Sequence, residues 1–263
     1  MPIYIRCIVV SFLLCVNGCL FAQYYPASTI PDSLKVNANS VIRNYSMQFI
    51  QSDANNGTYK VNKVITILNE KGSDFAVFYT YEDKFRTITN FSGVVRDASG
   101  KIVKKIKKSD LHTSSMSDDA LANDNIDVAY EYKSPSYPFT IEYTYEVKYK
   151  NGILHYPAFF PVAGYTQSVE KADYSIQFPS DRNIRYRTFS NCMVNEQEET
   201  GKKVYNMSLA GFKAIEKESF SPPVDRIFPA VEMSPSDFCY DSHCGNMSDW
   251  KNYGLWAYGL LKD

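Results

Sequence analysis

The sequence contains little of what nucleic-acid binding or hydrolytic catalysis requires. Lysine and arginine number 28 against 29 aspartate and glutamate residues, so the basic excess of a nucleic-acid-binding surface is missing. The three histidines are His112, His155 and His243, and no Gly-x-Ser-x-Gly motif is present. Since nucleophilic hydrolysis and acyl transfer need a Ser or Cys beside a histidine and an orienting carboxylate, this scarcity argues against such an enzyme. After residue 22, no apolar run is long enough to span a membrane.

The first 22 residues have the pattern of a secretory signal. Arg6 provides a positively charged start, residues 7–16 form a short apolar core, and Ala22 precedes a cleavage position. We therefore expect a cleaved signal peptide over residues 1–22 and an exported protein in the periplasm or at the cell surface. The alternative is a lipoprotein in which Cys19 carries a lipid anchor, although Asn17 fits that motif poorly.

The rest of the chain has the patterning of a β protein. It is rich in tyrosine and phenylalanine, with 21 and 16 residues, which favours strands over helices. Residues 141, 143, 145 and 147 are apolar or aromatic while the residues between them are polar, as in a half-buried antiparallel strand. We therefore predict an all-β fold, an antiparallel β-sandwich with a short C-terminal helix. The sandwich is expected over residues 23–236, and a tail containing the helix over residues 237–263.

The turn residues and the apolar patterning predict ten strands. They are residues 41–50, 58–68, 74–81, 88–95, 101–106, 126–132, 140–149, 172–178, 184–189 and 203–210. The polar stretch 109–122 is expected to be a loop with one short helix. The C-terminal helix is predicted over residues 248–261, with Ser248 as its N-cap and an apolar stripe that includes Trp250 and Leu261.

Three cysteines follow the signal, namely Cys192, Cys239 and Cys244. Export permits a disulfide, and Cys239 and Cys244 can pair if the backbone turns back between them. Three free thiols are an equally weighted alternative. Cys239, Asp241, His243 and Cys244 also form a local cluster, but its spacing matches no established zinc site. We therefore predict no catalytic, metal or cofactor site.

Two groups of residues are candidates for a ligand surface. Lys104 and Lys105 belong to a lysine run between residues 101 and 108, which could contact an anionic glycan or lipid head group. Tyr143 and Tyr145 could stack against sugars. For each group we favour the simpler interpretation, which is a solvated strand end for the lysines and core packing for the tyrosines.

Five patterned stretches occur in order along about two thirds of the chain. They are residues 59–68, the YPFTIEYTY sequence at 137–145, FFPV at 159–162, VEKADYSIQFP at 169–179, and the AIEKE to PP passage at 214–223 followed by PAV at 229–231. In these stretches the chain resembles domain of unknown function 3857, which is found in exported bacterial proteins, usually just before a transglutaminase-like core. Proteins of this kind also have a helix like that of residues 250–261 at the junction to the core.

The resemblance implies a non-catalytic accessory or interaction domain of the cell envelope, with an unknown protein or glycan as its partner. The sequence stops at Asp263, about where the transglutaminase-like region would begin, so no residue here inherits that region's catalytic roles. Two alternatives remain. The chain is the leading part of a transglutaminase- or protease-like enzyme, or it is a glycan-binding module.

Overall fold

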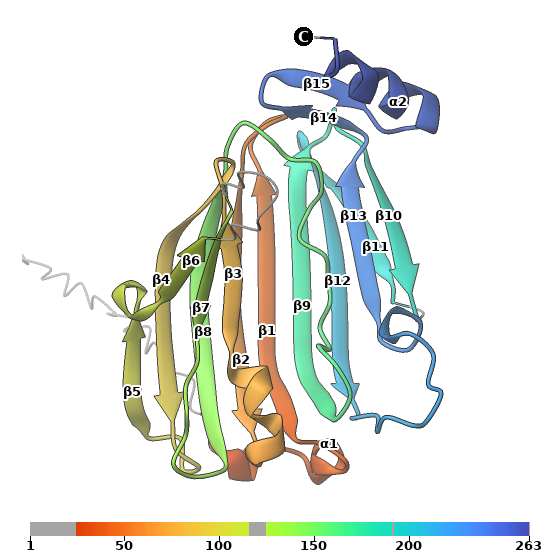
Figure 1. Ribbon diagram of the computed structural model, residues 1–263. Coiled ribbons are helices and arrows are strands. Elements are labelled where there is room, and N and C mark those ends of the chain that lie inside the picture. The colour runs from red at the N-terminus through yellow and green to blue at the C-terminus, as the bar shows by residue number, and fades with distance from the viewer. Residues whose placement is uncertain (1–24, 116–124, 191, 263) are drawn as a thin grey trace, which may run out of the picture.

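The computed structural model describes residues 25–115, 125–190 and 192–262, so the expected signal peptide and Cys19 lie outside the described residues. An eight-stranded sheet, the main sheet, dominates the fold in the order β11-β12-β9-β1-β2-β8-β4-β5 (Figure 1). Its strands are β1 (Ser40–Gln51), β2 (Gly57–Ile67), β4 (Arg86–Arg96), β5 (Ile102–Lys107), β8 (Phe139–Tyr149), β9 (Gln167–Pro179), β11 (Val194–Glu199) and β12 (Lys202–Phe212). The predicted β-rich fold is confirmed.

Two smaller sheets pack against one face of the main sheet. One has the order β3-β7-β6 and contains β3 (Phe78–Glu82), β7 (Ile126–Tyr130) and β6 (His112–Ser115). The other pairs β10 (Ile184–Phe189) with β13 (Ala230–Pro235). The layers meet through aromatic side chains. Phe78 of β3 lies 4.8 Å from Phe91 and 5.2 Å from Tyr145 between ring centroids, and Tyr186 of β10 lies 6.0 Å from Tyr205 of β12.

One strand pair of the main sheet is parallel, which a purely antiparallel sandwich would not contain. β9 runs parallel to β1, whereas the other main-sheet pairs are antiparallel. β8 and β9 therefore point the same way, and residues 150–166 must return along the length of the sheet between them. This return segment packs on the face that the smaller sheets cover, and it buries Tyr156, Phe159 and Val162.

The N-terminal segment forms a second, smaller core. It contains the 3-10 turn η1 (Ala27–Thr29) and the short helix α1 (Asp32–Lys35). Ile30, Leu34 and Val41 are buried together there, and the Ser168 hydroxyl of β9 donates a hydrogen bond to the Leu34 carbonyl at 2.7 Å. The described N-terminal residues are thereby fastened to the main sheet.

A C-terminal unit packs against one end of these layers (Figure 1). It consists of β14 (Asp237–Tyr240), β15 (His243–Asn246) and α2 (Trp250–Gly259). Its attachment includes a β-bridge between Gly152 and Tyr240 and an ion pair of 2.7 Å between Lys84 and Asp241. No helix among the described residues is long and apolar enough to cross a membrane.

Three local predictions are wrong. Residues 74–76 are not strand, because the 3-10 turn η2 (Glu70–Ala76) precedes β3. The N-cap of α2 is Asp249, whose carboxylate accepts the Asn252 N–H at 2.7 Å, while the Ser248 hydroxyl bonds to Asn246 instead. The polar stretch 109–122, predicted to be a loop with one short helix, instead contains β6, because residues 112–115 pair with β7 after the 3-10 turn η3 (Lys108–Asp110). A further 3-10 turn, η4 (Val224–Arg226), precedes β13.

Candidate ligand-binding groove

A groove of about 660 Å³ lies between the two smaller sheets, above the main sheet. It is lined by Tyr59, Thr80, Tyr81, Arg86, Val147, Tyr149, residues 155–158, residues 185–187 and residues 232–234. We call this cavity the groove. Its volume is in the range of small-molecule and peptide sites, and its lining combines aromatic rings with a few charged groups, as such sites usually do.

The floor of the groove comes from the main sheet. Tyr59 of β2 is directly opposite Val147 of β8 in the strand register, and Tyr149 is opposite Arg86 of β4. Because side chains alternate along a strand, Val147 and Tyr149 share the face that is turned toward the smaller sheets. Burial raises the pKa of Tyr149 to about 12 despite the nearby Arg86 guanidinium. The floor therefore presents neutral phenols that can donate or accept hydrogen bonds.

Arg86 is held in place at one side of the groove. Its guanidinium donates to Asp83 Oδ2 from Nε at 3.0 Å and from Nη2 at 2.5 Å, and it lies 3.7 Å from the centre of the Tyr81 ring. Asp83 also accepts the backbone N–H groups of Phe85 and Arg86. Since Asp83 offsets its charge, Arg86 contributes a rigid edge to the groove more than a free cation.

The other side of the groove comes from β10 and β13. Arg185 and Arg187 share one face of β10, opposite Ser234 and Glu232 of β13 in the register. Arg187 lies 4.7 Å from the centre of the Phe189 ring. Among the described residues, neither arginine has a carboxylate within ion-pair distance. Two cations are therefore available to a ligand on this side.

His155 is exposed at the rim of the groove. Partial burial and the neighbouring Arg86 guanidinium lower the pKa of its imidazole, while Asp83 acts in the opposite direction. A histidine with a lowered pKa is neutral at pH 7 and serves as a hydrogen-bonding group. His112 and His243 lie elsewhere, on β6 and β15.

Tyr143 lies in the core and the half-buried Tyr145 packs against it, which favours core packing over the sugar-stacking interpretation of Tyr143 and Tyr145. Tyr143 is buried and its hydroxyl donates to the Ala76 carbonyl at 2.7 Å. Both rings lie within 5.3 Å of Phe78, between centroids. The physical reason is that β3 covers the inward face of β8. The simpler interpretation, core packing, describes both residues.

Lys104 and Lys105 are exposed on β5, at the outer edge of the main sheet. Lys104 lies over the Tyr130 ring, with its Nζ 5.5 Å from the ring centre, and a hydrogen bond to Tyr130 raises the pKa of the lysine. Neither lysine lines the groove. The four candidate ligand residues are therefore not brought together.

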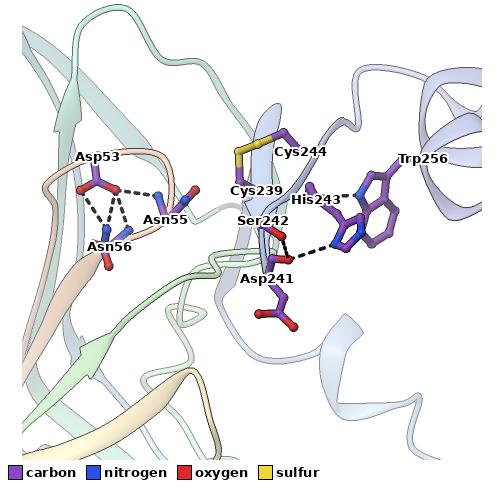
Figure 2. Close-up of a disulfide and its surroundings, with 9 residues drawn as sticks. All are labelled: Asp53, Asn55, Asn56, Cys239, Asp241, Ser242, His243, Cys244 and Trp256. Atoms are coloured by element: carbon purple, nitrogen blue, oxygen red, sulfur yellow. Dashed lines mark hydrogen bonds between the residues drawn. A yellow bond between two sulfur atoms is a disulfide. The ribbon is translucent and has the colours of Figure 1, made fainter. Parts of the chain in front are cut away.

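Cys239 and Cys244 are joined by a disulfide across the β14–β15 hairpin, where they are directly opposite in register (Figure 2). Near them, His243 Nδ1 lies 3.0 Å from the Asp241 carbonyl, and its own carbonyl accepts the Trp256 indole N–H at 3.3 Å. Because both thiols are used in the bond, neither can act as a thiolate metal ligand. No group of three metal-ligating side chains occurs among the described residues.

The arginines of β10 were missed as functional residues. The sequence IRYRTF at 184–189 does contain two positive charges on alternate positions, which is a usable signal for a charged strand face. The sequence does not show that this strand borders a groove, because the groove forms only when β13 and residues 155–158 meet β10 and the main sheet.

Comparison with known families provides the identification. Residues 53–216 match the family model described as Domain of Unknown Function with solved-structure structure (DUF3857). The chain belongs to this family. The match covers most of the main sheet of the DUF3857 fold, including the strands that form the groove floor. No curated protein matches the chain.

Among solved structures, the chain is similar to a crystal structure described as a "putative protease" from Parabacteroides distasonis. The TM-score is 0.61 at 17% identity, and the likeness covers 74% of this chain and 40% of the other. It shows a shared fold. An M1 zinc metallopeptidase from Deinococcus radiodurans, at 6% identity, and an aminopeptidase A from Legionella pneumophila, at 9%, have TM-scores of 0.32 and 0.33, too low to support an argument. The likeness to the Deinococcus enzyme covers 75% of this chain and 42% of that structure, and the likeness to the Legionella enzyme covers 82% of this chain and 23% of that structure. The DUF3857 chain therefore spans less than half the length of either structure.

Proposed function

We propose that this DUF3857 chain is a non-catalytic accessory module of the bacterial cell envelope that binds a protein or glycan ligand in the groove. The observation that carries the proposal is the groove itself, with its tyrosine floor and the two arginines, Arg185 and Arg187, at its side. Tyrosine and arginine are the residues that most often anchor binding interfaces, because they combine large contact area with directional hydrogen bonds.

The state of the cysteines supports a binding role. Cys239 and Cys244 form a disulfide, and burial raises the pKa of the Cys192 thiol. Since the nucleophilic form of cysteine is the thiolate, none of these three sulfur atoms is prepared for attack at neutral pH. The neutral phenols and guanidinium groups of the groove are suited to recognition.

Export of the protein is the second part of the proposal. It is supported by Arg6, the apolar residues 7–16 and Ala22 at the expected cleavage position. The Cys239–Cys244 disulfide is consistent with it, because disulfides persist mainly in oxidising compartments outside the cytosol.

A second candidate is the leading part of a transglutaminase- or protease-like enzyme, in which this module positions the substrate for a separate catalytic part. The likeness to 40% of the longer Parabacteroides structure favours it. So does α2, which has no buried residue and exposes Trp250 and Leu255, as a helix that packs on a further domain would. Reading the DNA past the codon for Asp263 tests this candidate, since an in-frame region with Cys, His and Asp in transglutaminase order supports it.

An activity assay tests the main proposal. The purified protein is incubated with fluorogenic peptides, and with glutamine- and lysine-containing peptides that report cross-linking. We expect no turnover above a heat-denatured control. In parallel, soluble peptidoglycan fragments and peptide pools are added to the protein, and its melting temperature is measured. A ligand that binds in the groove should raise the melting temperature, and the Tyr186→Ala/Arg187→Ala variant should show a smaller rise. Cleavage or cross-linking by the protein alone would refute a non-catalytic role.

A further inference from the structure

We propose that the outer edge of β10 binds an extended acidic peptide segment as an added β-strand, with alternate carboxylates of that segment paired to Arg185 and Arg187. The inference rests on the proposed binding function and names its ligand class. It depends on three features of the molecule. They are an open strand edge, two arginines on that strand that form no ion pair among the described residues, and two cavities that meet at Arg185.

The edge of β10 that faces away from β13 is open. Among the described residues, β10 pairs only with β13. The Ser236 N–H donates to the Asn183 carbonyl at 2.8 Å, and Pro235, opposite Ile184, has no N–H to donate. In an antiparallel pair the hydrogen-bonding residues alternate, so the backbone groups of Ile184, Tyr186 and Thr188 point away from β13. These groups are what an added strand binds.

The charges on this strand select an acidic segment. Arg185 and Arg187 are two residues apart, which separates their Cα atoms by about 7 Å along an extended chain. An added strand has the same repeat, so Asp or Glu at alternate positions lies beside both arginines. The nearest carboxylate in the register, Glu232, is opposite Arg187 on β13, on the side away from the open edge. It forms no ion pair with Arg187.

Two cavities border the first part of this strand and meet at Arg185. The groove takes in Tyr186 and both arginines. A second cavity of about 400 Å³ shares Arg185 with the groove and is lined further by Trp250 and Tyr253 at the start of α2. Side chains of an added strand beside Arg185 and Arg187 would therefore have room in these cavities, whereas Thr188 and Phe189 line neither of them.

The other long free edges of the fold are less suitable. β11 carries Glu196, Glu198 and Glu199, which repel an acidic strand. β5 carries Lys104 and Lys105 at the opposite edge of the main sheet, but neither of them lines the groove or the second cavity. Exposed lysines on an edge strand usually prevent pairing with other chains, because charges there must stay solvated. This makes β5 a matched control for β10, since both edges are cationic and only β10 borders the groove and the second cavity.

The experiment measures binding of a fluorescein-labelled peptide, Thr-Glu-Val-Glu-Val-Glu-Thr, to the purified protein by fluorescence polarisation. Arg185→Ala/Arg187→Ala should weaken binding about five- to tenfold, as expected for two partly exposed ion pairs. Lys104→Ala/Lys105→Ala should leave it within twofold. Thr188→Pro removes an outward N–H without removing a bond to β13, and should weaken binding about tenfold, whereas Thr188→Ala should not.

Two peptide controls test the strand geometry. N-methylation of the alternate amides that face β10 should abolish binding, while methylation of the other set should not, because only one edge of an added strand is bonded. A peptide with Lys in place of Glu should not bind. A thermal melt of each variant checks that it is folded. If the Thr188→Pro variant is unfolded, the N-methylated peptides alone test whether the edge of β10 is bonded.

The possible outcomes separate this inference from the proposed function. Binding of a polygalacturonate oligosaccharide in place of the peptide, still lost in the arginine variant, would overturn the peptide inference and keep the groove as a binding site. Loss of peptide binding in the lysine variant only would assign it to β5 and overturn the inference. Absence of peptide binding would also overturn it. The proposed function itself fails through catalytic turnover, or if a stabilising ligand stabilises the Tyr186→Ala/Arg187→Ala variant as much as the unmodified protein.

Discussion

The main sheet with its covering layers and the C-terminal unit are stabilised by different means. In the main sheet, residues such as Phe49, Ile141 and Tyr174 are almost completely buried, and their contacts link strands far apart in sequence. In the C-terminal unit, Phe238 is buried and packs against Trp256 at 4.8 Å between centroids, but α2 has no buried residue. Trp250 is 88% exposed and Leu261 is 83% exposed.

The difference shows which part of the molecule supplies its stability. Burial of apolar surface stabilises the main sheet in proportion to the area removed from water. The C-terminal unit buries little apolar surface. It depends on a disulfide, a helix cap and a few contacts to the turns at the end of the main sheet. Regions with few buried contacts open at lower free energy than the core, so we expect the C-terminal unit to unfold locally before the main sheet.

The largest expected effect is on the main sheet. Phe49→Ala removes a ring that packs edge-on against Tyr149 and Tyr156, each 5.2 Å away between centroids. We expect a loss of about 3–5 kcal/mol in the free energy of unfolding, the cost of lost burial and of the cavity that remains. Urea denaturation followed by tyrosine fluorescence measures it. A loss below about 1 kcal/mol would mean that this centre of the core is loosely packed.

A smaller and local effect is expected in the C-terminal unit. Replacing both Cys239 and Cys244 by serine removes a cross-link between residues that are five apart in sequence. For so short a loop the loss is about 2 kcal/mol, and it should be confined to this unit. Hydrogen exchange should speed up in residues 237–259 and stay unchanged in β1 and β2. Equal acceleration in both regions would contradict the separation of the two parts.

A third effect depends on pH and concerns a charge inside the main sheet. Lys63 of β2 lies on the inward side with its Nζ 4.9 Å from the centre of the Tyr45 ring, and burial lowers its pKa to about 8. Above pH 8 the unfolded chain keeps a proton that the folded protein has lost, so this group makes stability rise with pH toward 10. Burial raises the pKa of Tyr45 to about 12, so this neighbour stays neutral in that window.

Lys63→Met should therefore stabilise the protein at pH 7 by about 1–2 kcal/mol, since the folded state no longer holds a partly buried ammonium group. It should also flatten the rise in stability between pH 8 and 10. Urea denaturation at several pH values measures both effects. Lys60→Met, at an exposed position of the same strand, is the matched control, with a change below about 0.5 kcal/mol. A destabilised Lys63→Met variant at pH 7 would show that the ammonium group is favourably bound.

The smallest effect is expected at α2. Trp250→Ala removes a large aromatic side chain, as Phe49→Ala does, but from an exposed position whose near neighbour is the Tyr253 ring at 6.4 Å. We expect a change below about 0.5 kcal/mol in the free energy of unfolding. Sedimentation velocity on the unmodified protein and on the Trp250→Ala variant controls for self-association through the exposed helix. A loss above 1 kcal/mol in a monomer would show that α2 is part of the cooperative fold.

Much of the fold was predictable because the inward strands follow simple patterns. All ten predicted strands overlap an observed strand, namely β1, β2, β3, β4, β5, β7, β8, β9, β10 and β12, although the strand predicted at 74–81 overlaps β3 only from residue 78. β11 was missed because its residues, VNEQEE, have no apolar alternation, and it exists by pairing with β12. β13 was missed because its partner β10 is more than 40 residues away in sequence. Neither pairing leaves a local signal.

The candidate site was less predictable for the same reason. A tyrosine on a strand has the same appearance in the sequence whether another layer covers it, as for Tyr143, or leaves it at a cavity, as for Tyr149. Likewise, the lysine run that includes Lys104 and Lys105 stands out in the sequence, but the basic residues that line the groove are Arg185 and Arg187 of β10.

The sequence by itself determined the β-rich class, the family, the C-terminal helix and the candidate cysteine pair, because these depend on residue type and on short-range spacing. Tertiary structure decided the parallel pairing of β1 with β9, the covering of Tyr143 and Tyr145, the exposure of α2 and the position of the groove. Each of these depends on which elements meet across long separations in the chain. The free energy of those contacts comes from burial between layers, which residue patterns along one strand do not record.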